Sequence, residues 1–121
     1  MEQLDIKQIL TDAGADYDKG LERFMGNVAL YHKFLLKFLD DGSFAQFKQS
    51  VAENDMEQAG KHVHTLKGTA GNLSLMRLFK AADDTVKAIR AGKTAAEVEP
   101  MAQQVEKVYT ETCDAIRKTI G

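Results

Sequence analysis

The chain has 121 residues, of which 44% are hydrophobic and 28% charged, and its formal net charge is −2. This length and composition suit one soluble domain with its own core, and they exclude a disordered chain. The slightly acidic balance argues against a nucleic-acid-binding protein, which would show a basic stripe.

The composition favours helices over strands, because the chain has one proline, no tryptophan and few clusters of β-branched residues. Residues 26–27, 41–42 and 92–93 pair glycine with Asn, Asp or Lys and have the composition of turns. We predict helices at residues 5–11, 15–25, 27–40, 43–52, 55–74, 75–91 and 97–119.

Two of the predicted helix starts carry residues with the spacing of a capping box. In that motif the side chains of the first and fourth residues satisfy free backbone amides at the helix start. The pairs with this spacing are Ser43 with Gln46 and, overlapping at the next helix, Asn54 with Glu57 and Asp55 with Gln58.

The predicted helix 27–40 is apolar around about 220° of its circumference, which is more than a surface helix needs to face one core. Phe34 flanks its central apolar stripe on one side. Two interpretations fit this breadth: a central helix contacted by several neighbours, or a helix with one exposed margin that docks a partner. In the second interpretation Phe34 is a docking residue.

The predicted helix 55–74 turns a histidine toward solvent. On a helical wheel of about 100° per residue with His64 at 0°, Leu66, Ala70 and Leu73 fall at roughly 180–240° and define the core side. His64 therefore points away from the core.

Glycines surround His64 on this wheel, because Gly60, Gly68 and Gly71 all lie within about 40° of it. Glycine in a helix costs about 0.5–1 kcal/mol relative to alanine, so its use on an exposed face needs a reason. One reason is steric, since a bare backbone lets another protein approach the imidazole. The other is that Gly68 and Gly71 permit close helix packing, or that Gly71 ends the helix.

The residues beside His64 favour phosphoryl chemistry over an idle surface histidine. An exposed imidazole titrates near neutral pH and offers an unprotonated ring nitrogen as a nucleophile. Lys67 lies one helical turn further on, at about −60°, where a cation would meet the oxygens of a phosphoryl group on the ring.

The predicted helix 97–119 has a regular apolar stripe that includes Cys113, and Pro100 falls in its first turn, where the missing N–H costs little. Cys113 is the only cysteine, so we expect a buried structural thiol, no internal disulfide and a reducing compartment. Long helices joined by short turns predict an all-α fold over residues 1–121, an antiparallel up-and-down four-helix bundle with short N-terminal helices packed against it.

The segment 64–73, HTLKGTAGNL, resembles the H-x-L-K-G-x-A-x-x-L signature of histidine-containing phosphotransfer (HPt) domains. The similarity extends upstream to 20–24 and to Tyr31, Leu35 and Phe38, and downstream to 88–92, so it covers about residues 18–92. The resemblance implies a four-helix bundle whose exposed histidine accepts a phosphoryl group from a receiver-domain aspartate and passes it to another receiver domain.

Carried over by position, the resemblance makes His64 the phospho-acceptor and Lys67 the phosphate-facing cation. Gly68 would give clearance for the partner. The helical wheel adds Gly60 and Gly71 as candidate docking residues, and the apolar margin of the predicted helix 27–40 adds Phe34. The chain would then be a phosphocarrier that binds no cofactor or metal, while its partner receiver domain supplies magnesium and the aspartate.

The chain departs from the family pattern at three positions. Val63 replaces a frequent alanine, and Ser74 stands where glycine is usual. Val86 occupies a position often held by Glu or Gln across from the histidine, so a neighbouring side chain that orients the imidazole is in question.

Other functions fit the residues less well. His62 and His64 form an H-x-H pair, but two residues two apart on a helix diverge by about 160–200° and cannot chelate one metal ion. His62 is expected to be a half-buried packing residue. The dimerisation domain of a sensor kinase would need an acidic residue directly after the histidine, where this chain has Thr65.

Two alternatives stay open from the sequence: an HPt-like domain phosphorylated directly by a kinase catalytic domain, and a helical adaptor or dimerisation module without chemistry. The first 5 residues lack the features of a secretory signal, and no apolar run approaches the roughly 20 residues that span a bilayer. We therefore expect a cytoplasmic monomer without membrane association.

Overall fold

All seven predicted helices are present in the computed structural model, which describes residues 3–120, and no strand occurs in that range. The helices are α1 (Gln3–Asp12), α2 (Tyr17–Arg23), α3 (Val28–Phe38), α4 (Ser43–Ala52), α5 (Met56–Asn72), α6 (Met76–Arg90) and α7 (Ala95–Thr119). Within residues 3–120, no helix combines the length and the hydropathy that crossing a membrane requires.

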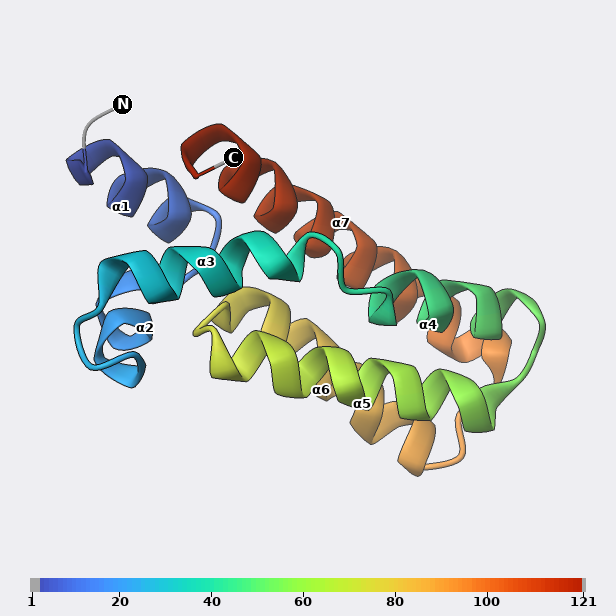
Figure 1. Cartoon of the computed structure of the whole chain (residues 1–121). Coiled ribbons are helices and arrows are strands. Elements are labelled where there is room, and N and C mark those ends of the chain that lie inside the picture. Colours follow the sequence, from blue (N-terminus) through green and yellow to red (C-terminus); the bar gives the residue numbers. More distant parts are fainter. Residues whose placement is uncertain (1–2, 121) are drawn as a thin grey trace.

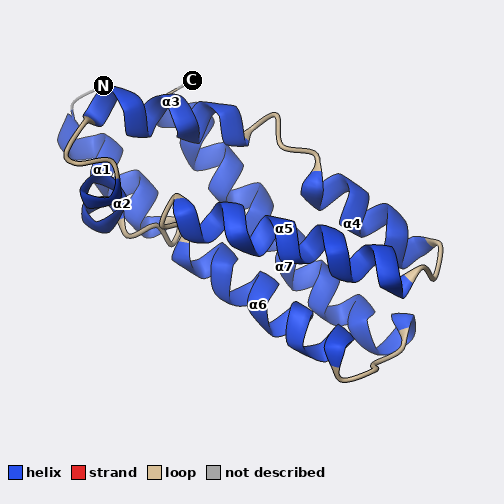
Figure 2. Cartoon of the chain, turned by 60° about the horizontal axis from the view of Figure 1, so that its bottom comes forward, coloured by secondary structure: helices blue, strands red, loops and turns tan. Residues whose placement is uncertain are grey.

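Helices α4 to α7 form an antiparallel up-and-down four-helix bundle, as predicted. Each contacts the next, and α7 closes the ring against α4 (Figure 1). Figure 2 shows α5 lying between α4 and α6. The turns 53–55, 73–75 and 91–94 are short, so successive helices must reverse direction.

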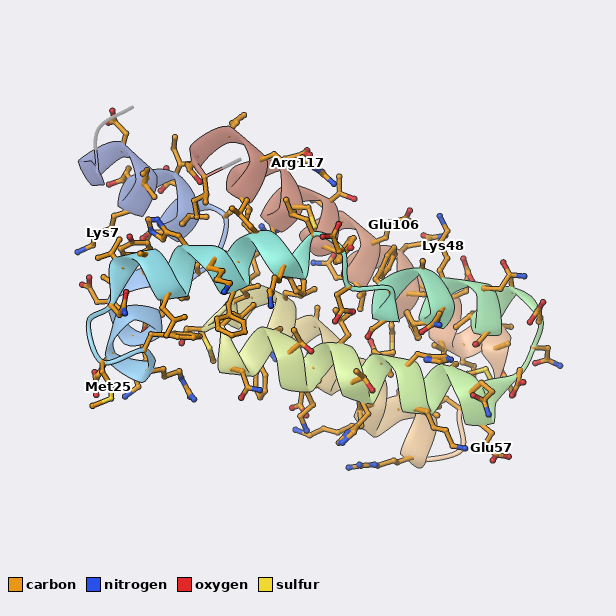
Figure 3. The ribbon with its side chains drawn as sticks, viewed as in Figure 1. Lys7, Met25, Lys48, Glu57, Glu106 and Arg117 are labelled. Carbon is orange, nitrogen blue, oxygen red and sulfur yellow. The ribbon has the colours of Figure 1, made fainter. Side chains whose placement is uncertain are left out.

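The three N-terminal helices pack on one end of this bundle. Helix α1 lies along the C-terminal part of α7, and α2 connects α1 to α3, which also touches α7 (Figure 1). The ion pair between Lys48 and Glu106, at 2.8 Å, joins the surfaces of α4 and α7 (Figure 3). Cys113 is buried in α7 as expected, and burial raises the pKa of its thiol.

Helix α4 begins at residue 43 as predicted, but of the capping residues predicted for α4 and α5 only Asp55 of α5 caps its helix. Asp55 caps α5, because its side chain accepts a hydrogen bond from the Gln58 amide at 3.1 Å. The capping box predicted at Ser43 is wrong, because Ser43 is already the first residue of α4. Gly42 precedes it without a side-chain cap, and the Ser43 amide donates to Asp41 Oδ1 at 2.7 Å.

A capping box that the sequence interpretation overlooked begins α7. The Glu97 amide donates to Thr94 Oγ1 at 3.2 Å, and the Thr94 amide donates to Glu97 Oε1 at 3.0 Å. The hydrogen bonds that the Thr94 amide and hydroxyl donate to the Glu97 carboxylate lower the pKa of that carboxyl. The helix therefore begins at Ala95 and not at residue 97, so Pro100 lies inside the helix and not in its first turn as predicted. There its ring removes one helical hydrogen bond.

Helix α3 contacts α2 and α7, but its neighbours do not enclose it. Tyr31, Leu35 and Phe38 are buried, but Phe34 and Leu36 on the two flanks are 39% and 37% exposed. The broad apolar arc of the sequence therefore corresponds to one buried stripe with exposed apolar margins. This is the geometry that the docking interpretation requires.

Tyr31 ties α3 to the C-terminal end of α5. Its hydroxyl donates to the Leu73 carbonyl at 2.8 Å, and its ring is completely buried. Gly20 of α2 makes this possible, because a Cβ at that position would overlap the Tyr31 hydroxyl. Burial raises the pKa of Tyr31, so the hydroxyl stays protonated and can donate.

Ser74→Gly is expected to stabilise the protein, because Ser74 has a strained backbone conformation. It has a φ of 56°, in the left-handed region, and its fully buried hydroxyl has no hydrogen-bond partner among the described residues. Relief of both defects outweighs the greater chain entropy of glycine, so Ser74→Gly should gain about 1 kcal/mol.

A thermal melt of Ser74→Gly beside wild type measures this effect as a rise of roughly 3–5 °C. Asn54→Gly is the control, since Asn54 also has a positive φ, of 59°, but is exposed. Asparagine tolerates that conformation, so this second variant should change the melting temperature less. A lower melting temperature for Ser74→Gly would show that the Ser74 side chain contributes packing.

Candidate functional site

His64 lies near the middle of α5, on the face opposite the buried Leu66 and Ala70. Its side chain is exposed, as the helical wheel predicts. Among residues 3–120 the His64 ring makes no side-chain hydrogen bond and no ion pair, whereas His32 is 2.6 Å from the Tyr17 hydroxyl. The His64 ring is therefore free to meet another molecule.

A groove of about 380 Å³ runs beside His64 between α5 and α6. Val86 is buried in its floor, so the residue across from the imidazole offers no hydrogen bond that would orient the ring. The groove is lined by Glu57, Gly60, Lys61, His64, Val86, Ile89 and Arg90.

Ile89 and Arg90 belong to the family similarity at 88–92, but the sequence did not predict them as site residues. The signal that could have found them is their spacing, because residues three and four positions after Val86 share its side of a helix.

The three glycines near His64 have different surroundings. A Cβ on Gly60 would lie 3.2 Å from Ile89 Cγ2, and one on Gly71 would lie 3.1 Å from Phe79 Cδ1, so both glycines let α5 pack closely on α6. A Cβ on Gly68 would meet nothing within 4 Å. Gly68 thus borders open space beside His64, while a docking role for Gly60 and Gly71 stays a prediction.

Lys67 does not extend freely into solvent. Its Nζ is 3.1 Å from Asp83 Oδ1 on α6, and it lies 5.9 Å from the centre of the Phe79 ring. Only 25% of its side chain is exposed. Before phosphorylation, therefore, the Lys67 cation is held against α6, and its phosphate-facing role stays a prediction.

Phe34 lies on a different helix from His64 and does not line the groove beside it. Its ring packs against Phe24, with 5.5 Å between ring centres, and Lys37 Nζ is 5.4 Å from the Phe34 ring centre. At the turn before α3, the side chain of Met25 is 95% exposed (Figure 3). This edge of the molecule is apolar, but its docking role stays a prediction.

His62 is half-buried, as expected for a packing residue. Burial lowers the pKa of His32, which lies on α3. Among residues 3–120, no group of three or more His, Cys, Asp or Glu side chains is arranged to hold a metal ion.

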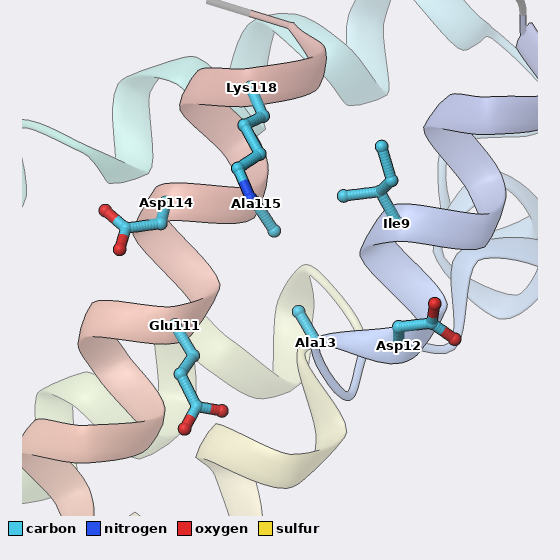
Figure 4. A pocket seen from close by; sticks show the side chains of 7 residues that line it. All are labelled: Ile9, Asp12, Ala13, Glu111, Asp114, Ala115 and Lys118. Carbon is cyan, nitrogen blue, oxygen red and sulfur yellow. The ribbon is translucent and has the colours of Figure 1, made fainter.

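A second hollow, of about 400 Å³, lies between α1 and α7 (Figure 4). Its acidic side chains have partners, because Glu111 pairs with Arg77 at 2.6 Å and Asp114 with Arg117 at 3.4 Å. Its walls contain no histidine or cysteine that could act as a nucleophile. The lining residues are Ile9, Asp12, Ala13, Glu111, Asp114, Ala115 and Lys118.

Comparison with protein families gives a match to the Hpt domain over residues 34–119. No curated protein and no solved structure matches the chain. The family match contains the signature at 64–73 and the whole four-helix bundle, and it extends beyond residue 92, where the similarity noted in the sequence ends. It begins after residues 20–24 and Tyr31, so that upstream part of the similarity is not included.

Hpt domains carry out histidine phosphotransfer in two-component systems and interact with the receiver domains of response regulators. The family match spans most of the chain, and the exposed histidine of its signature lies on the surface of the predicted bundle. The chain belongs to the Hpt domain family.

Proposed function

We propose that this chain is a phosphorelay intermediate, which accepts a phosphoryl group on His64 from the aspartyl phosphate of one receiver domain and passes it to the aspartate of another. The observation that carries the proposal is the exposed His64 ring, which makes no hydrogen bond to any described residue and lies beside the open surface at Gly68. A side chain that accepts a phosphoryl group from one domain and passes it to another must be accessible to both domains.

The chemistry uses one nitrogen of the imidazole. The unprotonated ring nitrogen attacks the phosphorus of the aspartyl phosphate, the bond between phosphorus and the carboxylate oxygen breaks, and the carboxylate leaves with the electron pair. The other ring nitrogen keeps its proton. The reverse sequence transfers the group from the phosphohistidine to the next aspartate.

The two partners divide the work of this transfer. Phosphoryl transfer depends on the positioning of the reacting groups and on the charges placed around the moving group. In our proposal the receiver domain contributes its aspartate and a magnesium ion, and this chain contributes His64, with Lys67 nearby. The chain is thus a phosphocarrier whose rate depends on how closely the partner can dock.

Transfer from a labelled receiver domain tests the proposal. A receiver domain phosphorylated with ³²P-labelled acetyl phosphate is mixed with the chain, and the label on the chain is treated with acid and with alkali. We expect label that is lost in acid and stable in alkali, as a phosphohistidine requires, and that leaves the chain when a second, unlabelled receiver domain is added.

A parallel sample contains the chain with labelled ATP and magnesium but no partner, and it should stay unlabelled. Strong labelling in that sample would show that the chain is itself a kinase. Labelling by a kinase catalytic domain but by no receiver domain would show that the proposed donor is wrong.

A further inference from the structure

A carboxylate on α6 lies between two ammonium groups beside the phosphorylation site. Asp83 Oδ1 is 3.1 Å from Lys67 Nζ on α5, and Asp83 Oδ2 is 3.0 Å from Lys87 Nζ one turn further along α6. The Asp83 side chain is only 20% exposed. The hydrogen bonds from Lys87 and Lys67 lower the pKa of Asp83, so its carboxyl is ionised at neutral pH.

This carboxylate competes for a cation that lies one helical turn from His64 on α5. Lys67 follows His64 by three residues, and side chains at this spacing are neighbours on a helix surface. A phosphoryl group on the ring would carry two negative charges within reach of the same ammonium. The Lys67 cation must then divide its attraction between the phosphoryl oxygens and Asp83.

We propose that Asp83 is a positioning residue that restrains Lys67 on α6 and so limits how far Lys67 stabilises the phosphohistidine. The proposal rests on the function proposed above, because it requires His64 to carry the group. As long as Asp83 holds Lys67, the phosphohistidine is less stabilised and gives up its phosphoryl group more readily.

The direction of the effect follows from the transition state. When the phosphohistidine hydrolyses, water adds to phosphorus while the phosphorus–nitrogen bond breaks, the ring nitrogen keeps the electron pair, and inorganic phosphate leaves. In a loose transition state the oxygens of the phosphoryl group carry less negative charge than they do in the phosphohistidine. A cation on those oxygens therefore stabilises the phosphohistidine more than the transition state and slows its loss.

The test compares phosphohistidine lifetimes in variants loaded with phosphoramidate, a small donor that needs no partner protein. Asp83→Asn releases Lys67, so we expect the half-life of the phosphohistidine to lengthen on the order of two- to five-fold, the range of a partly exposed ion pair. The equilibrium with a receiver domain should shift toward the phosphohistidine by a similar factor. A melting curve for each variant confirms that the fold persists.

Three further variants separate this role from a structural one. Asp84→Asn removes the neighbouring carboxylate, which pairs with Lys80 at 3.1 Å, and should leave the lifetime unchanged. Asp83→Glu keeps the negative charge and should restore the wild-type lifetime. In a Lys67→Met background, Asp83→Asn should have no effect, because the two residues act through one interaction.

An unchanged or shorter lifetime in folded Asp83→Asn would overturn the inference, as would the same lengthening in the Lys67→Met background. Both results leave the proposed function intact if receiver domains still exchange the label with wild type. Conversely, a lengthened lifetime with no exchange between any receiver domain and wild type contradicts the relay and not the role of Asp83. A wild-type chain that phosphoramidate does not label at His64 overturns both.

Discussion

His64→Gln is expected to reduce phosphorylation of the chain by a receiver domain to background while the fold persists. The variant removes the nucleophilic ring nitrogen. Because the side chain is exposed and the ring makes no hydrogen bond within residues 3–120, its loss should change the free energy of unfolding by no more than about 0.5 kcal/mol. Receiver-dependent labelling and a thermal melt, each compared with wild type, measure the two effects.

His62→Gln is the matched control, because it removes the other histidine of the H-x-H pair. His62 is half-buried and two residues from His64, so its side chain lies on nearly the opposite side of α5. This variant should keep acceptor activity, although it loses some packing. Label retained on folded His64→Gln would end the interpretation of His64 as the acceptor.

Gly68→Gln is expected to cut transfer from a receiver domain on the order of 100-fold, because a side chain there meets the incoming partner before the imidazole does and holds the reacting atoms apart. The helix itself should not suffer, since a Cβ on Gly68 has nothing within 4 Å. Glycine is a poor helix former, so the variant should be about 0.5–1 kcal/mol more stable than wild type.

Transfer rates and melting curves for a graded pair of variants measure this effect. Gly68→Ala should fall between wild type and Gly68→Gln in rate, because it adds less bulk. Lys67→Ala removes charge without adding bulk, so docking should survive while the transfer rate or the phosphohistidine lifetime changes. Normal transfer by Gly68→Gln would place the docking surface elsewhere, and an unfolded Gly68→Gln would identify Gly68 as a packing residue.

The existence and order of the helices could be read from the sequence because turns and apolar periodicity are local signals. The errors lie at the helix ends, where several residues compete to satisfy the same backbone amides. Ser43 has the composition of a cap, but the Asp41 carboxylate accepts the hydrogen bond from its amide. Thr94 and Glu97 form the real capping box of α7, and the same spacing was visible in the sequence.

The contacts around His64 could not be predicted from the sequence, because they depend on the tertiary structure. A helical wheel places Gly60, Gly68 and Gly71 near His64, but it does not say on which side α6 lies. The contacts of α6 with α5 separate Gly68 from the other two. For the same reason the partner of Lys67 was not predictable, because Asp83 belongs to the next helix and its distance from Lys67 depends on how α5 and α6 pack.

The contact between α1 and α7 joins helices from opposite ends of the chain, so forming it closes a loop of nearly the full sequence. The helices around His64 are joined by the short turns 53–55 and 73–75, which close much smaller loops. Loop-closure entropy grows with loop length, and non-local contacts slow folding. The segment that carries His64 can therefore assemble from neighbouring helices early in folding, before the ends of the chain meet.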